Sequence, residues 1–234
     1  MLNINSHKKI LLQILFDICS DKTIAPFLGF KGETAAYLFY NLPRFSVDLD
    51  FDLLDISKEN EIFNKIQKII KQYGVIKEAQ IKRFNLLFIL SYDQKIPSTQ
   101  NVKIEINRRN FGSKYELKSY MGISMLVMTK KDMFSHKLMA MHERLGKTNR
   151  DIYDVWFFEK NNWLINKELV EAKSKMPYKK FLQKLIFHLE KLNNRNILSG
   201  LGELLDEKQK SWVKTKLKLE TLFLLKIRLS NCAD

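Results

Sequence analysis

Residues 30–54 read FKGETAAYLFYNLPRFSVDLDFDLL, and the end of this stretch decides how the whole sequence is interpreted. There, three aspartates, Asp48, Asp50 and Asp52, alternate with one leucine and one phenylalanine. Alternate residues of a β-strand face the same way, so the pattern predicts three carboxylates on one face, about 6–7 Å apart, and apolar side chains in the core. At an effective dielectric constant of about 20, each neighbouring pair of carboxylates would repel by roughly 2–3 kcal/mol.

A bound cation would offset this repulsion. Mg²⁺ prefers oxygen ligands and is commonly held by one or two carboxylates together with substrate phosphates. Two such ions, about 3.5–4 Å apart, can stabilise the attacking and leaving oxygens of a phosphoryl displacement. An edge strand with a solvated acidic face is the alternative, because water also screens the repulsion. The alternation by itself leaves both interpretations open.

Two neighbouring features favour a site for a phosphorylated ligand. Gly32 follows an apolar run and precedes TAAYLFYN, a predicted short helix, so backbone N–H groups at its start could bind phosphate. Glu105 lies between two isoleucines of a predicted strand, VKIEI, where it shares a face with Lys103 and Asn107. If that strand pairs beside the aspartate strand, Glu105 completes a carboxylate triad; otherwise it is an ordinary solvent-facing residue.

The order of predicted elements indicates an α+β fold in two parts. Strand-like runs cluster in residues 25–128, with amphipathic helices over residues 7–19 and 58–74. From residue 129 onward only helical patterns follow, over residues 132–145, 149–160, 166–176, 178–193 and 206–228. We therefore expect one domain at 1–128 and an α-helical domain at 129–234. The last segment, LKLETLFLLKIRLS at residues 217–230, is expected to be core rather than an exposed partner surface.

The charge distribution suggests a polyanionic partner. The chain of 234 residues has a net charge of +14, yet its first 56 residues carry 5 basic and 7 acidic side chains. An acidic motif thus belongs to an otherwise basic protein, which favours contact with nucleic acid or nucleoside triphosphates. A lysine-rich surface that only aids solubility is the alternative. No apolar run reaches about 18 residues, so no membrane segment is expected. Cys19 and Cys232 suggest no disulfide framework, so we expect a cytoplasmic protein.

Two helical segments add charged candidates. Lys137 and Arg144 fall on one face of the predicted helix, where a solvated lysine is the simpler interpretation. Arg150, Asp151 and Asp154 lie near the start of the next helix, where acidic residues also favour the helix dipole and intrahelical ion pairs are an alternative. His136 and His142 are six residues apart, which does not suit a zinc pair on one helix.

Taken together, these motifs resemble a known family. The motifs, in chain order, are GET at 32–34, RFSVDLDFD at 44–52, KIEI at 103–106, SHKLMAMHERL at 135–145 and RDIYDV at 150–155. They are similar to the polymerase-β-type nucleotidyltransferase superfamily, and most of all to its AbiEii/AbiGii branch, the toxins of abortive-infection and MenT toxin–antitoxin systems. The resemblance covers residues 25–158 and implies a nucleotidyltransferase-type mixed sheet flanked by helices, followed by a helical bundle that contributes to the nucleotide site.

The resemblance also implies roles for individual residues. Asp48, Asp50 and Glu105 would hold Mg²⁺ or Mn²⁺, with Glu105 as ligand or as base for the attacking hydroxyl. Together with Lys137 and Asp151 they form the expected catalytic set. The expected nucleotide-binding set is Gly32, Thr34, Arg44, Ser46, Lys137, Arg144, Arg150 and Asp154. The chain departs from the family pattern at Glu33, where relatives have glycine or serine.

The sequence thus predicts an Mg²⁺-dependent nucleotidyltransferase that moves a nucleoside monophosphate from an NTP to a hydroxyl, with release of pyrophosphate. The basic remainder favours RNA, such as the acceptor end of a tRNA, and the resemblance implies a toxin with a cognate protein antitoxin. Two alternatives remain: a nucleotidyltransferase that acts on a protein or small molecule, and a non-catalytic protein that binds NTP or RNA and lacks turnover because of Glu33.

Overall fold

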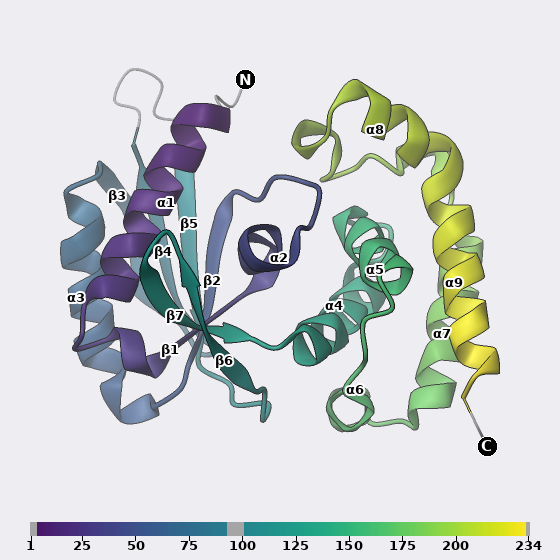
Figure 1. Cartoon of the computed structure of the whole chain (residues 1–234), viewed down its shortest axis with the longest axis horizontal. Coiled ribbons are helices and arrows are strands. Elements are labelled where there is room, and N and C mark those ends of the chain that lie inside the picture. Colours follow the sequence, from purple (N-terminus) through teal and green to yellow (C-terminus); the bar gives the residue numbers. More distant parts are fainter. Residues whose placement is uncertain (1–3, 93–100, 233–234) are drawn as a thin grey trace. The chain divides into compact units, whose positions relative to one another are not determined.

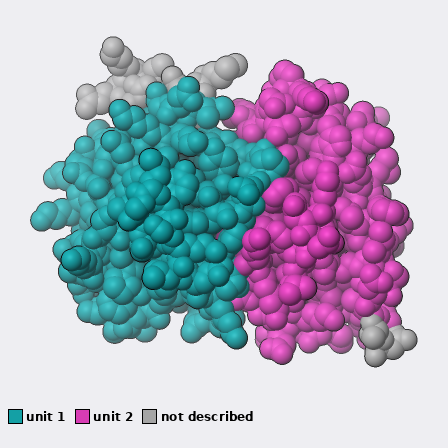
Figure 2. Space-filling view, in the orientation of Figure 1, with its two compact units in different colours: residues 1–129 teal, residues 130–234 magenta. Residues whose placement is uncertain are grey.

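The computed structural model describes residues 4–92 and 101–232. The chain divides into two compact units, residues 1–129 and 130–234, coloured separately in Figure 2. Among the described residues, the first unit holds seven β-strands and three α-helices, and the second holds helices alone. This arrangement confirms the predicted α+β fold class, with strands gathered in the first part of the chain.

A mixed seven-stranded sheet forms the centre of the first unit (Figure 1). Its spatial order is β3-β4-β5-β2-β1-β7-β6. Strand β2 pairs antiparallel with β1 and parallel with β5, which places the aspartate strand in the middle of the sheet. The strands are β1 Leu28–Lys31, β2 Asp48–Leu53, β3 Val75–Ile81, β4 Asn85–Ser91, β5 Asn101–Asn107, β6 Tyr115–Tyr120 and β7 Ile123–Met128.

The two faces of the sheet differ in what covers them. Helices α1 (Ile4–Ser20) and α3 (Glu59–Lys71) cover the apolar face, and α2 (Gly32–Tyr40) lies on the other face beside β1 and β2 (Figure 1). Leu49 and Phe51 of β2 point to the apolar face and are fully buried. Burial of these two side chains stabilises the strand whose opposite face carries the aspartates.

Gly74 follows α3, at the point where the chain turns toward β3. Its φ is not positive in the structure. Its importance is the close approach of two backbones, because a Cβ atom there would lie 2.2 Å from the Ser91 carbonyl oxygen. The residue is therefore needed for packing of the chain against the end of β4, rather than for its backbone freedom.

The second unit contains six α-helices in its described residues. They are α4 Lys130–Arg144, α5 Arg150–Lys160, α6 Lys167–Ser174, α7 Tyr178–Lys191, α8 Glu207–Trp212 and α9 Lys218–Ser230. Helix α5 packs against both α4 and α9. Aromatic side chains fill the core, including Phe158 and Trp163, whose rings stack with centroids 4.0 Å apart. Across residues 4–92 and 101–232, no helix combines the length and apolar character that a membrane crossing requires.

The expectation that the whole last segment is core is wrong for one face of α9. Thr221 and Leu225 are fully buried, as expected. Leu219, Phe223 and Ile227, however, are exposed. A 3.6-residue period shows which side chains share a helix face, but it does not show whether another element covers that face.

Candidate active site

The carboxylates of β2 and β5 lie side by side on one face of the sheet. In the parallel pairing, Asp50 is opposite Glu105 and Asp48 is opposite Lys103. Residues directly opposite each other on neighbouring strands project to the same face. The predicted pairing of the Glu105 strand beside the aspartate strand is thus confirmed, and Asp48, Asp50 and Glu105 converge from residues far apart in the sequence.

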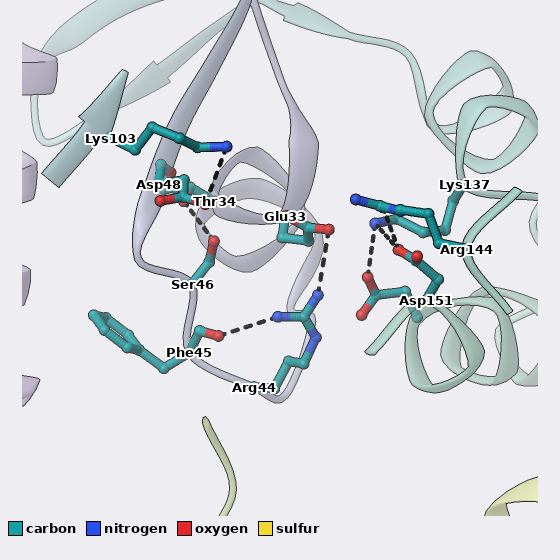
Figure 3. A network of polar contacts seen from close by, with 11 residues as sticks. Glu33, Thr34, Arg44, Phe45, Ser46, Asp48, Lys103, Lys137, Arg144 and Asp151 are labelled. Carbon is teal, nitrogen blue, oxygen red and sulfur yellow. Dashed lines mark hydrogen bonds and ion pairs between the residues drawn. The ribbon is translucent and has the colours of Figure 1, made fainter. Parts of the chain in front are cut away.

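Lys103 lies among these carboxylates. Its Nζ is 3.6 Å from Asp48 Oδ2 (Figure 3). The same atom is 3.2 Å from Glu105 Oε2. Burial opposes the charged form of Lys103, but the carboxylates of Asp48, Asp50 and Glu105 outweigh it and raise the pKa of the lysine. Burial likewise opposes ionisation of Glu105, but Lys103 and a 2.7 Å hydrogen bond from Asn85 hold the pKa of Glu105 below its usual range. The Lys103 ammonium group thus pairs with Glu105 and Asp48 at the acidic cluster.

Asp50 is the carboxylate with the most perturbed ionisation. Burial, followed by the nearby Glu33 carboxylate, raises the pKa of Asp50 to about 7, and Asp48 adds to this repulsion. Lys103 and Lys31 act in the opposite direction without cancelling it. Because burial is the largest cause, the ionised form of Asp50 is disfavoured, and a cation bound beside it would stabilise that form.

Gly32 brings the N-terminus of α2 against Asp50. Its φ of +75° is a conformation that L side chains rarely adopt. A Cβ atom at this position would lie 2.5 Å from Asp50 Oδ2. Both observations require glycine at this position, and the predicted contact of Gly32 with a nucleotide remains a prediction. The N-terminus of α2 consequently lies beside the Asp50 carboxylate, where backbone N–H groups could donate to a phosphate group.

Buried hydrogen bonds fix the segment that leads into β2. The Thr34 hydroxyl donates to the Asp48 carbonyl oxygen and is hydrogen-bonded to the Ser46 hydroxyl at 2.8 Å (Figure 3). His7 of α1, also buried, is 3.0 Å from the Val47 carbonyl oxygen through Nε2. Thr34 and Ser46 therefore position Asp48 in this structure, and their predicted contact with a triphosphate remains a prediction.

Glu33, the departure from the family pattern, is paired with Arg44. Both side chains are buried, and Arg44 Nη2 is 3.6 Å from Glu33 Oε1 (Figure 3). Arg44 Nη1 also donates to the Phe45 carbonyl oxygen at 3.2 Å. The guanidinium partly neutralises the carboxylate that would otherwise repel a triphosphate. Arg44, which is predicted to bind nucleotide, thus contacts Glu33 and the Phe45 carbonyl oxygen in this structure.

Asp52 differs in its surroundings from the other two aspartates. It is buried and forms an ion pair with Lys31. Its carboxylate also accepts hydrogen bonds from Asn107 Nδ2 at 2.7 Å and from the Tyr115 hydroxyl. With three partners, Asp52 joins strands β1, β5 and β6 and has the contacts of a structural residue.

The second unit contains its own charged cluster at the contact between α4 and α5. Lys137 Nζ lies 2.9 Å from Asp151 Oδ1 and 3.0 Å from Asp154 Oδ2, and all three side chains are buried. Arg144 Nη2 is 2.8 Å from the same Asp151 oxygen (Figure 3). The pairs thus join two helices, rather than lying within one. Arg150 opens α5 and is half-buried.

This fold and acidic cluster define the class of protein. A central sheet with paired carboxylates on adjacent strands, beside a glycine at a helix N-terminus, is the arrangement expected of a nucleotidyltransferase, and the enzyme is of that class. The chain belongs to the AbiEii family of nucleotidyl transferase toxins from type IV toxin–antitoxin systems, whose model matches residues 13–222.

Solved structures share the fold. JHP933 from Helicobacter pylori is 20% identical, with a TM-score of 0.64 over 98% of this chain and 93% of that chain. The MenT4 nucleotidyltransferase toxin from Mycobacterium tuberculosis is 16% identical, with a TM-score of 0.57 over 96% of this chain and 87% of that chain. No curated protein sequence matches significantly. At these identities the structural likeness establishes the fold alone.

Proposed function

We propose that this toxin transfers a nucleoside monophosphate from an NTP to a hydroxyl of RNA, such as the acceptor end of a tRNA, and releases pyrophosphate. The observation that carries the proposal is the register of β2 and β5, which sets Asp50 directly opposite Glu105 and beside Asp48. Positioning and charge neutralisation would supply most of the rate enhancement in such a reaction.

The acidic cluster fits a hard divalent cation, Mg²⁺ or Mn²⁺. Asp48, Asp50 and Glu105 offer oxygen ligands on one sheet face, and Asp50 is difficult to ionise without additional positive charge. These three residues would hold the ion. When bound, such an ion supplies charge neutralisation for the phosphates at the reacting centre.

The chain's own groups suggest the remaining roles. The N–H groups at the start of α2 would bind the triphosphate, with Gly32 allowing its close approach. Glu105 would accept the proton of the attacking hydroxyl when it is not acting as a ligand. In the helical unit, Lys137 and Arg144 would contribute positive charge to nucleotide binding, and Asp151 would orient them.

Three further points belong to the proposal. The basic remainder of the chain supports an RNA acceptor over a neutral small molecule. Membership in a toxin–antitoxin family supports a cognate protein antitoxin. The composition and cysteine usage support a cytoplasmic location. A protein or small-molecule acceptor remains the second candidate, and the Glu33–Arg44 pair supports an active site over a non-catalytic NTP- or RNA-binding protein.

The test is transfer of label from each NTP, supplied separately with Mg²⁺ and total RNA. We expect one or more NTPs to label RNA, and Asp48→Ala or Asp50→Ala to abolish the labelling. Asp55→Ala is the matched control, because this nearby carboxylate accepts hydrogen bonds from Ser57, outside the acidic cluster. Label that appears in protein or small molecules would change the acceptor, and label that survives both alanine substitutions would overturn the catalytic assignment.

A further inference from the structure

An alternating row of guanidinium groups and aromatic rings lies at one end of strands β4 and β5. The Arg83 guanidinium lies 5.0 Å from the centroid of the Phe84 ring. Arg109 lies between two rings, 5.1 Å from the centroid of Phe84 and 5.2 Å from that of Phe111. We call these four residues the arginine–phenylalanine ladder. Its members come from the β3–β4 turn and from the segment after β5.

The Phe84 ring is exposed although its backbone is firmly held. Phe84 is 47% exposed. Its carbonyl oxygen accepts a 2.8 Å hydrogen bond from the Arg108 N–H, and the Arg108 side chain donates to the Lys82 and Arg83 carbonyl oxygens. Arg108 is itself held by Glu59. The turn therefore presents the ring on an anchored backbone, which lowers the entropy cost of binding there.

The ladder retains its positive charge. Within residues 4–92 and 101–232, neither Arg83 nor Arg109 forms an ion pair with a carboxylate. By contrast, Lys82 at the same turn is paired with Glu78 at 2.7 Å. An exposed ring beside two cations without carboxylate partners suits a ligand that combines flat aromatic groups with negative charge.

The ladder is connected to the carboxylate face of the sheet. Arg109 Nε donates to Asn107 Oδ1 at 3.0 Å, and Asn107 donates to Asp52. On the neighbouring strand, Asn85 directly follows Phe84 and donates to Glu105. Arg109 follows Glu105 by four positions, a span of about 13 Å for extended chain. A strand of nucleic acid bound at the ladder could thus continue toward the carboxylates.

We propose that the arginine–phenylalanine ladder binds unpaired RNA, with Phe84 stacking on a base and Arg109 contacting the backbone phosphates. Bases that are not in a duplex expose faces for stacking on aromatic and guanidinium groups, whereas a paired helix does not. The inference rests on the proposed function in one respect, the choice of RNA as acceptor. The substrate that we propose for this surface is an RNA with a single-stranded end or loop.

The test is the affinity of the protein for a fluorescent single-stranded RNA oligonucleotide, measured by anisotropy without NTP or metal. Because both remove base–aromatic stacking, Phe84→Ala and Phe84→Leu should each weaken binding about tenfold. Phe84→Trp should preserve it, and a blunt duplex of the same sequence should be affected less than about twofold. Arg109→Gln should reduce the slope of log affinity against log salt by about 0.7.

Phe187→Ala is the matched control. Phe187 is 51% exposed and has Lys191 4.0 Å from its ring centroid, so it reproduces an exposed ring with one cation on a helix of the other unit. Wild-type affinity in Phe84→Leu, or an equal loss in Phe187→Ala or on the duplex, would overturn the inference. If Phe84→Leu binds RNA normally while RNA is still labelled, the proposed role of the ladder is wrong and the proposed reaction stands. If RNA binds selectively at the ladder but is not labelled, only the proposed reaction is contradicted.

Discussion

Substitution of Asp50 by asparagine should stabilise the metal-free protein while removing its activity. Burial and the Glu33 carboxylate raise the pKa of Asp50 to about 7, against 3.8 for an unperturbed aspartate. Because the folded-state pKa is the higher one, the folded protein binds more protons than the unfolded chain between these values. Stability is therefore lost as pH rises from about 4 to about 7. Asparagine has nearly the same shape and does not titrate, so it avoids this loss.

The magnitude follows from the shift. A displacement of roughly three pKa units, at 1.36 kcal/mol per unit, sets an upper limit of about 4 kcal/mol. Asp50 retains partial exposure to solvent, and water screens part of the interaction, so about 2 kcal/mol is the expected gain above pH 7.5. Near pH 4 the two proteins should be equally stable, because the aspartate is then protonated in the folded state.

The assay is urea denaturation of both proteins at pH 4, 6 and 8, with EDTA and then with Mg²⁺. Without metal, the stability difference should grow with pH in favour of Asp50→Asn. A saturating ion at about 100 times its Kd adds about 2.7 kcal/mol to a protein that binds it, so Mg²⁺ should stabilise the wild type more than the variant. A difference that is independent of pH, or a variant less stable than the wild type at pH 8, would refute the reasoning.

Three further substitutions test the surroundings. Lys103→Met removes the ammonium group from the acidic cluster, so the free energy of unfolding of the metal-free protein should fall by about 1–2 kcal/mol in urea denaturation. Mg²⁺ should then stabilise this variant more than it stabilises the wild type. Gly32→Ala should cost about 1–3 kcal/mol and reduce NTP binding in calorimetry, whereas Gly112→Ala, with the same sign of φ and open space around it, should cost only the backbone strain. Asp151→Asn leaves buried Lys137 with one carboxylate fewer, and thermal unfolding should show a loss of about 1–3 kcal/mol; an unchanged melting temperature would contradict this role.

The sequence predicted those features that depend on local periodicity. Alternation predicted that Asp48 and Asp50 lie on one face of their strand and that two core residues lie on the other. The conditional prediction that the Glu105 strand pairs beside it is confirmed by the register. That pairing could not be deduced from the sequence, because residues 50 and 105 are joined only through the long-range order of strands. The Glu33–Arg44 pair was missed for a similar reason: its two members meet across a loop that has no repeating pattern.

Other features require knowledge of what covers a surface. The alternation on β5 put Lys103 on the same face as Glu105, but its contact with Asp48 depends on the neighbouring strand. No local pattern of the sequence relates His7 to β2, and the packing of α1 brings it to the Val47 carbonyl oxygen. The exposed stripe on α9 shows the converse, an apolar pattern that does not report whether a neighbour is present.

The most direct test of the central claim compares NTPs labelled at the α-phosphate and at the γ-phosphate, incubated with the protein, Mg²⁺ and RNA. If Asp48, Asp50 and Glu105 support nucleotidyl transfer, the α-label should enter RNA, the γ-label should appear in pyrophosphate, and Asp50→Asn should abolish both. Entry of the γ-label into RNA, or α-labelling that persists in Asp50→Asn, would contradict the account.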